Sequence, residues 1–134
     1  MMTKNQQENR AKDQAKLQLE SIREMVKALQ TAQEENDDKV DEARERILQD
    51  PLSVEVRTGW HTPGSEDATP TEYAILLCTG GPAVRIVGDL SEYQEPESAH
   101  LEFQDWFTPW TPYLLDAEEE ADVLEYARQF YFGA

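Results

Sequence analysis

The sequence predicts an α+β fold with an N-terminal helix or helical hairpin, a four-stranded antiparallel sheet, and a C-terminal helix packed on the sheet. Three observations predict it: apolar residues at helical spacing between residues 15 and 47, four later runs of strand character, and a helix N-cap signal at Asp116. We divide the chain into a flexible segment 1–14, a helical arm 15–49 and an acidic α+β domain 51–134.

The helical arm is predicted from a seam of apolar residues at alternating spacings of four and three, the pattern of one helix face. The seam consists of Ala15, Leu19, Ile22, Val26 and Leu29. The polar run 34–38 interrupts it, and it resumes from Val40. Two structures fit: a hairpin, with Asn36 or Asp37 capping the second helix, or one long helix with a polar patch. We favour the hairpin.

An apolar seam of this kind can pack against the sheet of its own chain or pair with a second copy of the chain. We expect the second use, a homodimer formed through the N-terminal helices by Leu19, Ile22, Val26 and Leu29. Segment 1–14 has no apolar stripe to bury, so we expect it to fray. Asp50 precedes Pro51, which ends the second helix, because a residue before proline is disfavoured in the α region.

Four strands are predicted next, at residues 53–60, 72–79, 83–87 and 99–104. Three of them alternate apolar and polar residues, whereas 72–79 is almost continuously apolar and predicts a central strand. Two glycines and a proline at 80–82 supply a turn between the second and third strands. An antiparallel meander is the simplest assembly of these strands.

Segment 105–113 joins the sheet to the last helix and holds four aromatic residues and two prolines. One interpretation is a loop over the end of the sheet, in which Trp106 and Trp110 complete the core together with Trp60. The other is a rigid recognition edge, because aromatic side chains beside prolines lose little entropy on binding.

The C-terminal helix is predicted from a capping box, in which Asp116 is the N-cap and Glu119 is the carboxylate at the third helical position. Its apolar residues are Val123, Leu124, Ala127, Phe130 and Tyr131. We expect the helix to stop near Gly133 and to cover one face of the sheet.

The net charge of the chain is -16, and most of it lies in the sheet domain. Residues 1–50 hold nine Lys or Arg and twelve Asp or Glu, whereas residues 51–134 hold three Arg and sixteen Asp or Glu, a balance of -13. Such a field repels nucleic acid and anionic lipid and attracts basic protein surfaces. We therefore expect no direct contact with nucleic acid or membrane, and a basic nucleic-acid-binding host protein as partner.

Few residues could carry chemistry. Cys78 lies in an apolar run, and His61 and His100 are the only histidines. Their spacing matches no metal-binding motif and no nucleophile with its base, so we expect no catalytic residue, no metal and no cofactor. A single cysteine and the absence of an apolar stretch long enough to span a bilayer favour a cytoplasmic location in a bacterial cell.

Two sets of residues are candidates for binding. The partner-binding set is Trp106, Trp110, Glu102, Asp105, Glu118, Glu119, Glu120, Asp122 and Glu125. The alternative is an anion or small-ligand spot formed by Trp60, His61, Arg57 and Arg85. Arg57 and Arg85 are two of the three cations beyond residue 50, and we favour a second interpretation, in which they join Glu55 and Glu102 on a polar strand face and form cross-strand ion pairs of modest value.

Five sequence blocks resemble a family of small uncharacterised proteins encoded by bacteriophages and other bacterial mobile elements. The blocks are DPLSVEVR (50–57), GWHTPG (59–64), LCTGGPAVRIVG (77–88), QDW (104–106) and TPWT (108–111). The resemblance covers about residues 20–133 and brings no established activity. It implies a setting in which small acidic proteins often inhibit host defence, some by imitating the charge of DNA.

Together, the resemblance and the charge lead to the hypothesis of a non-enzymatic inhibitor of a host defence nucleoprotein, in particular a CRISPR effector. One alternative is a small-ligand-binding protein or enzyme with a site near Trp60, His61 and Arg85. Another is a structural or regulatory phage protein that assembles through its helical arm.

Overall fold

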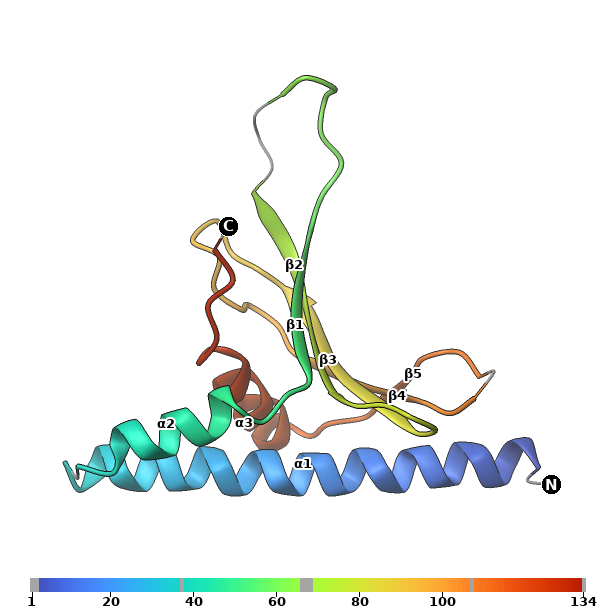
Figure 1. Cartoon of the computed structure of the whole chain (residues 1–134), viewed down its shortest axis with the longest axis horizontal. Coiled ribbons are helices and arrows are strands. Elements are labelled where there is room, and N and C mark those ends of the chain that lie inside the picture. Colours follow the sequence, from blue (N-terminus) through green and yellow to red (C-terminus); the bar gives the residue numbers. More distant parts are fainter. Residues whose placement is uncertain (1–2, 37, 66–68, 107, 134) are drawn as a thin grey trace.

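A layer of helices covers one face of an antiparallel sheet in the computed structural model of the chain (Figure 1). The structure describes residues 3–36, 38–65, 69–106 and 108–133. Within these residues the elements are α1 (Lys4–Glu34), α2 (Val40–Leu48), β1 (Ser53–Thr58), β2 (Pro70–Cys78), β3 (Ala83–Asp89), β4 (His100–Gln104), β5 (Thr111–Tyr113) and α3 (Ala117–Ala127). The α+β class predicted from the sequence is confirmed.

Helix α1 starts much earlier than the predicted arm. The side chain of Thr3 accepts a hydrogen bond from the Gln6 N–H over 3.1 Å, and the Gln6 side chain accepts one from the Thr3 N–H over 2.8 Å. This capping box satisfies two N–H groups that the helix itself cannot pair, so the helix begins at Lys4. Ala11 is fully buried in the core. The prediction of a flexible segment 1–14 is therefore wrong from Lys4 onward.

Helices α1 and α2 form the predicted hairpin, in which α2 runs back along α1 (Figure 1). Asn36 reverses the chain in a left-handed conformation, with φ of 52°. Asparagine tolerates this region better than most residues. The N-cap of α2 is Lys39, whose side chain makes no capping hydrogen bond, so the predicted cap by Asn36 is wrong. Asp37, the other predicted cap, lies outside the described residues.

The sheet is a meander with strand order β1-β2-β3-β4-β5, and every neighbouring pair is antiparallel. The sequence predicts four strands, and the structure adds β5, which pairs with β4 opposite Leu101–Phe103. Alternation could not reveal β5, because it has three residues and Pro112 at its centre. An edge strand tolerates a proline because its outer N–H needs no partner in the sheet.

The covered face of the sheet carries the core. Alternate residues of the central strand, Tyr73, Ile75 and Leu77, are buried beneath the helical layer. The apolar seam of α1 packs into the same core: Leu19, Ile22, Val26 and Leu29 are at most 2% exposed. Of the two uses expected for the seam, the structure shows packing within its own chain. These four side chains have no surface left to offer a second copy.

Helix α3 completes the core beside α1. Its predicted capping box is confirmed: Asp116 accepts a hydrogen bond from the Glu119 N–H over 2.8 Å, and Glu119 accepts one from the Asp116 N–H over 3.0 Å. The helix ends at Ala127, short of Gly133 where the sequence predicted its end. Phe132, beyond that end, still packs into the core.

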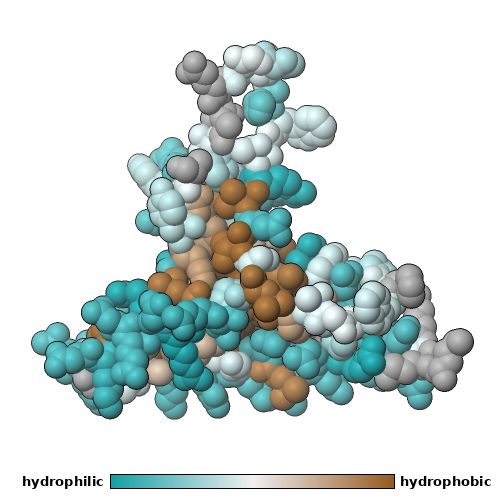
Figure 2. Space-filling model, in the orientation of Figure 1, coloured by the Kyte–Doolittle hydropathy of each residue, from teal (hydrophilic) through white to brown (hydrophobic). Residues whose placement is uncertain are grey.

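The outer side of the helical layer is polar, as the mostly teal surface over α1 and α2 in Figure 2 shows. Most exposed positions of α1 between the buried members of its seam are polar or charged, and Leu17, 58% exposed, is an exception. None of the helices in the described ranges combines the length and the apolar character that crossing a bilayer requires.

Candidate functional site

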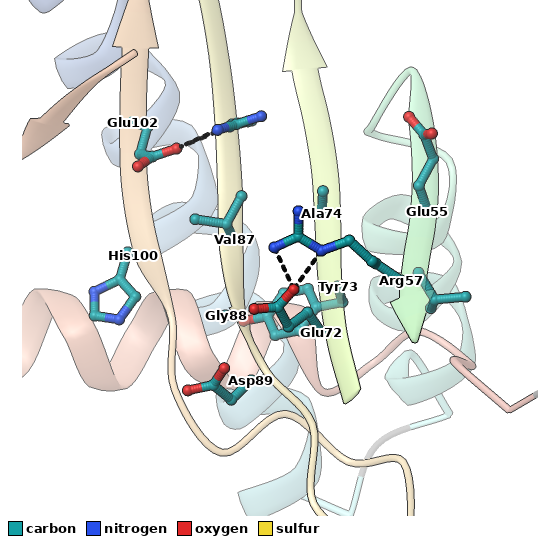
Figure 3. Close-up of a pocket in the computed structure, with 12 residues that line it drawn as sticks. Glu55, Arg57, Glu72, Tyr73, Ala74, Val87, Gly88, Asp89, His100 and Glu102 are labelled. Atoms are coloured by element: carbon teal, nitrogen blue, oxygen red, sulfur yellow. Dashed lines mark hydrogen bonds and ion pairs between the residues drawn. The ribbon is translucent and has the colours of Figure 1, made fainter. Parts of the chain in front are cut away.

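The second face of the sheet forms an open groove of about 650 Å³, which we call the open face. Figure 3 views this face, with helices behind the strands. Its charged residues and its histidine come from the first four strands, since every second side chain of a strand points to this face. They are Glu55, Arg57, Glu72, Arg85, Asp89, His100 and Glu102.

Two cross-strand ion pairs lie on the open face, because the strand register brings their members opposite each other. Arg57 of β1 pairs with Glu72 of β2, and Arg85 of β3 pairs with Glu102 of β4 through contacts of 2.8 Å (Figure 3). The interpretation of Arg57 and Arg85 as members of cross-strand ion pairs is confirmed. Glu55, on the same strand as Arg57, lies opposite Ala74.

The two pairs differ in exposure. The Arg57 side chain is 77% exposed, so water screens its ion pair and we expect a contribution near zero. The Arg85 side chain is 31% exposed and also lies 4.0 Å from the centre of the Trp110 ring, a cation–π contact. Arg85, Glu102 and Trp110 therefore form a fixed cluster that places Trp110 beside the open face.

Carboxylates outnumber guanidinium groups on the open face by four to two. Neither Glu55 nor Asp89 has a cation within 4.0 Å in the described part of the chain. His100 is exposed on the same face and is not among the site residues predicted from the sequence. The alternation of residues 99–104 was the signal that could have placed it beside Glu102. The open face can thus offer acidic side chains to a cationic surface.

Asp105, predicted to contact a partner, is buried. Its side chain is 0% exposed and pairs with Arg10 of α1. It also accepts a hydrogen bond from the Trp106 N–H over 2.7 Å. The carboxylate is surrounded by its own chain and offers no oxygen to a partner, so Asp105 is not part of a docking surface.

The acidic residues predicted on α3 lie away from Glu102, because α3 belongs to the helical layer and Glu102 lies on the opposite side of the sheet (Figure 1). Glu119 caps its own helix, and Asp122 pairs with Arg23 of α1 over 2.8 Å. The Glu125 side chain accepts a hydrogen bond from Gln129. Glu118 and Glu120 are exposed. The predicted partner-binding set is thus divided between two sides of the molecule.

The three tryptophans, which one interpretation of the sequence placed in the core, are exposed or only half-buried. Trp60 is fully exposed in the loop between β1 and β2, and Trp106 is 57% exposed near the turn at Gly81. Trp110 is half-buried under Arg85. The interpretation that these three complete the core is therefore wrong for Trp60 and Trp106. The core is filled instead by the helical layer.

The predicted anion or ligand spot is divided in the structure. Arg57 and Arg85 line the open face, and both are paired with carboxylates. Trp60 and His61 do not line this groove and lie in the loop that projects beyond the sheet (Figure 1). The four residues therefore do not form one site.

Reactive groups are equally scarce in the described residues. Cys78 is half-buried, and burial raises the pKa of its thiol, which keeps it protonated and poorly nucleophilic. No group of three or more His, Cys, Asp or Glu side chains in the described ranges could hold a metal ion.

Comparison of the chain with protein-family models, with curated proteins and with solved structures finds no match. The geometry and the charge of the open face are therefore the observations that bear on function.

Proposed function

We propose that the chain is a non-enzymatic binding protein of a bacteriophage or other mobile element that inhibits a nucleic-acid-handling defence protein of its bacterial host. A CRISPR effector is the partner that we would test first. The observation that carries this proposal is the open face, a groove of about 650 Å³ in which acids exceed bases, on a domain of strongly negative charge. The sequence resemblance to mobile-element proteins supplies the setting.

Electrostatics favours this class of partner. A surface that binds nucleic acid presents lysine and arginine side chains to phosphates, and an acidic protein can occupy such a surface in place of the nucleic acid. Glu55 and Asp89 lie on the open face without an ion-pair partner among the described residues, so their carboxylates are available to incoming cations. Trp110, beside the same face, adds an aromatic contact of the kind enriched in binding hot spots.

The scaffold favours binding without a large loss of entropy. The acids of the open face lie on neighbouring strands held in register by the sheet, so their spacing is fixed before a partner arrives. Charge complementarity of this kind accelerates association and weakens as salt rises. The inhibitor is therefore expected to release its partner at high ionic strength.

The test measures binding of target DNA by a purified CRISPR effector with its guide, with and without the protein, at low and high salt. Two variants with the same charge change separate the two sides of the molecule. The open-face variant is Asp89→Lys with Glu102→Gln, and the α3 variant is Glu118→Lys with Glu120→Gln.

We expect the wild-type protein to displace DNA and the open-face variant to bind the effector at least about tenfold more weakly, while the α3 variant binds as wild type. Displacement that neither variant changes would remove the acidic surface from the mechanism. A loss confined to the α3 variant would place docking on the helical side instead. If the effector is unaffected by the wild-type protein, an affinity capture from lysate at two salt concentrations tests other nucleic-acid-binding partners.

A second candidate function is binding of a small ligand in the same groove, whose volume lies within the range of ligand pockets, about 300–1,000 Å³. Arg85, His100 and Glu102 would provide its polar contacts. A thermal-shift screen of nucleotides and metal ions tests it, because a ligand that binds the folded state raises the apparent melting temperature. A flat response across the panel would count against this function.

A further inference from the structure

The two edges of the sheet are unequal. The β5 edge has three residues with a proline at the centre, which blocks the addition of another strand. The β1 edge, Ser53–Thr58, has six residues and contains no proline. Five of the six are exposed. The β1 edge is therefore the longer of the two and has no proline, and its edge features are the charges of Glu55 and Arg57 and a register shift at Arg57/Thr58.

The β1 edge also exposes apolar surface. Val54 and Val56 point toward the covered face but are 37% and 45% exposed, and Leu52 just before the strand is 61% exposed. Figure 2 shows brown side chains along β1, in the middle of an otherwise largely polar view. Exposed apolar residues in a contiguous stretch are typical of an interaction surface.

The ladder between β1 and β2 determines which main-chain groups face outward. The Leu76 carbonyl accepts a hydrogen bond from the Leu52 N–H over 2.8 Å, so the main chain of Leu76 faces β1, and by alternation that of Ala74 does too. Ala74 lies opposite Glu55, whose main chain therefore faces β2. Because the main-chain groups of successive strand residues point to opposite sides, the N–H and C=O of Val56, the next residue, face the free edge.

From this geometry we infer that two copies of the chain pair through their β1 strands, antiparallel about a two-fold axis at Val56. In that register Val56 lies opposite Val56 of the second copy, in a position to exchange two main-chain hydrogen bonds. Glu55 lies opposite Arg57 of the second copy, and Arg57 opposite its Glu55. Both side chains lie on the open face, so each Arg57, already paired with Glu72 of its own chain, meets a second carboxylate across the interface.

Charge selects this register over its neighbours. With the two-fold axis at Glu55, Glu55 would lie opposite Glu55 of the second copy. With the axis at Arg57, Arg57 would lie opposite Arg57 of the second copy. Like charges directly opposite each other destabilise strand pairing. The sequence of the edge is thus self-complementary in one register, which identifies a second copy of the same chain as the occupant. The inference does not depend on the proposed function.

The test measures molecular mass in solution by sedimentation across a range of concentrations. We expect the wild type to dimerise, and Glu55→Arg and Arg57→Glu each to raise the dissociation constant of the dimer by about tenfold or more, because each places like charges opposite each other twice. Mixing the two variants restores opposite charges at every position. We therefore expect the mixture to form a heterodimer at concentrations at which each variant alone is largely monomeric.

Two exposed positions elsewhere provide matched charge controls, Glu92→Arg in the loop after β3 and Arg46→Glu on α2. Both should dimerise as wild type, and circular dichroism should show that all four variants are folded. A wild type that stays monomeric at the highest concentration would overturn the inference and leave the β1 edge to a strand of another protein. A dimer that neither edge variant weakens, or a mixture that stays monomeric, would overturn it as well.

Discussion

Arg10 donates two hydrogen bonds to the buried carboxylate of Asp105, from Nε to Oδ2 over 2.8 Å and from Nη2 to Oδ1 over 2.7 Å. This bidentate pair fastens the N-terminal part of α1 to the connection between β4 and β5. A charge-assisted pair with both oxygens engaged is among the stronger polar contacts in proteins. It explains why α1 is ordered well before residue 15.

We expect Asp105→Ala to lower the free energy of unfolding by about 2–3 kcal/mol, because it removes the pair with Arg10 and the acceptor for the Trp106 N–H. Urea denaturation measures the change. Arg46→Ala, at an exposed position on α2, is the control and should change stability by less than about 0.5 kcal/mol. An Asp105→Ala protein as stable as this control would show that the pair is energetically neutral.

Tyr126→Phe should cost about 1.5 kcal/mol of unfolding free energy, since the Tyr126 hydroxyl donates to Asp50 Oδ2 over 2.7 Å at the start of the sheet domain. The change removes one oxygen and preserves the packing of the ring. Tyr131→Phe, at an exposed tyrosine, is the matched control and should be neutral. Equal melting curves for the two variants would contradict the role of the Tyr126 hydrogen bond.

Stability should fall above about pH 10. Burial raises the pKa of Tyr73 and of Tyr126 well above the usual value for tyrosine, about 10. The folded state therefore keeps these protons while the unfolded state releases them, so the stabilisation is complete below about pH 10 and decreases as pH rises. Tyrosinate absorbance during a pH titration should show two tyrosines that ionise only as the protein unfolds. Ionisation of all five tyrosines while the protein is still folded would contradict the raised pKa values of Tyr73 and Tyr126.

Gly88→Ala should destabilise the protein by about 3 kcal/mol. A Cβ at Gly88 would lie 2.0 Å from the carbonyl oxygen of Ser98, a main-chain atom that cannot move aside alone. Gly59→Ala is the control, because there a Cβ would meet Thr71 at an ordinary 3.5 Å. Thermal unfolding compares the two variants. An alanine tolerated equally at both positions would show that the main chain near Ser98 can shift.

The parts of the fold that local signals specify could be predicted from the sequence. The hairpin follows from the break in the apolar seam, and the start of α3 from the Asp116 capping box. The pairing of Arg85 with Glu102 follows from alternation on neighbouring strands. Each of these depends on residues close in sequence or on adjacent strands, where periodicity determines which side chains meet.

The remaining features depend on contacts that periodicity does not reveal. Asp105 resembles any other acid in an acidic chain until α1 brings Arg10 to it from 95 positions away. Trp60 resembles a core residue by its size, yet its loop projects away from the sheet. The division of the acids between the open face and α3 likewise requires knowing which face of the sheet the helices cover.

The contact of the first helix with the last constrains how the chain can fold as it is synthesised. Arg23 of α1 pairs with Asp122 of α3 across 99 positions, and the two helices pack together in the core, so the seam of α1 lacks part of its cover until α3 has been made. A nascent chain therefore carries the apolar seam of an otherwise polar helix partly uncovered until then, and transient apolar surface of this kind invites aggregation.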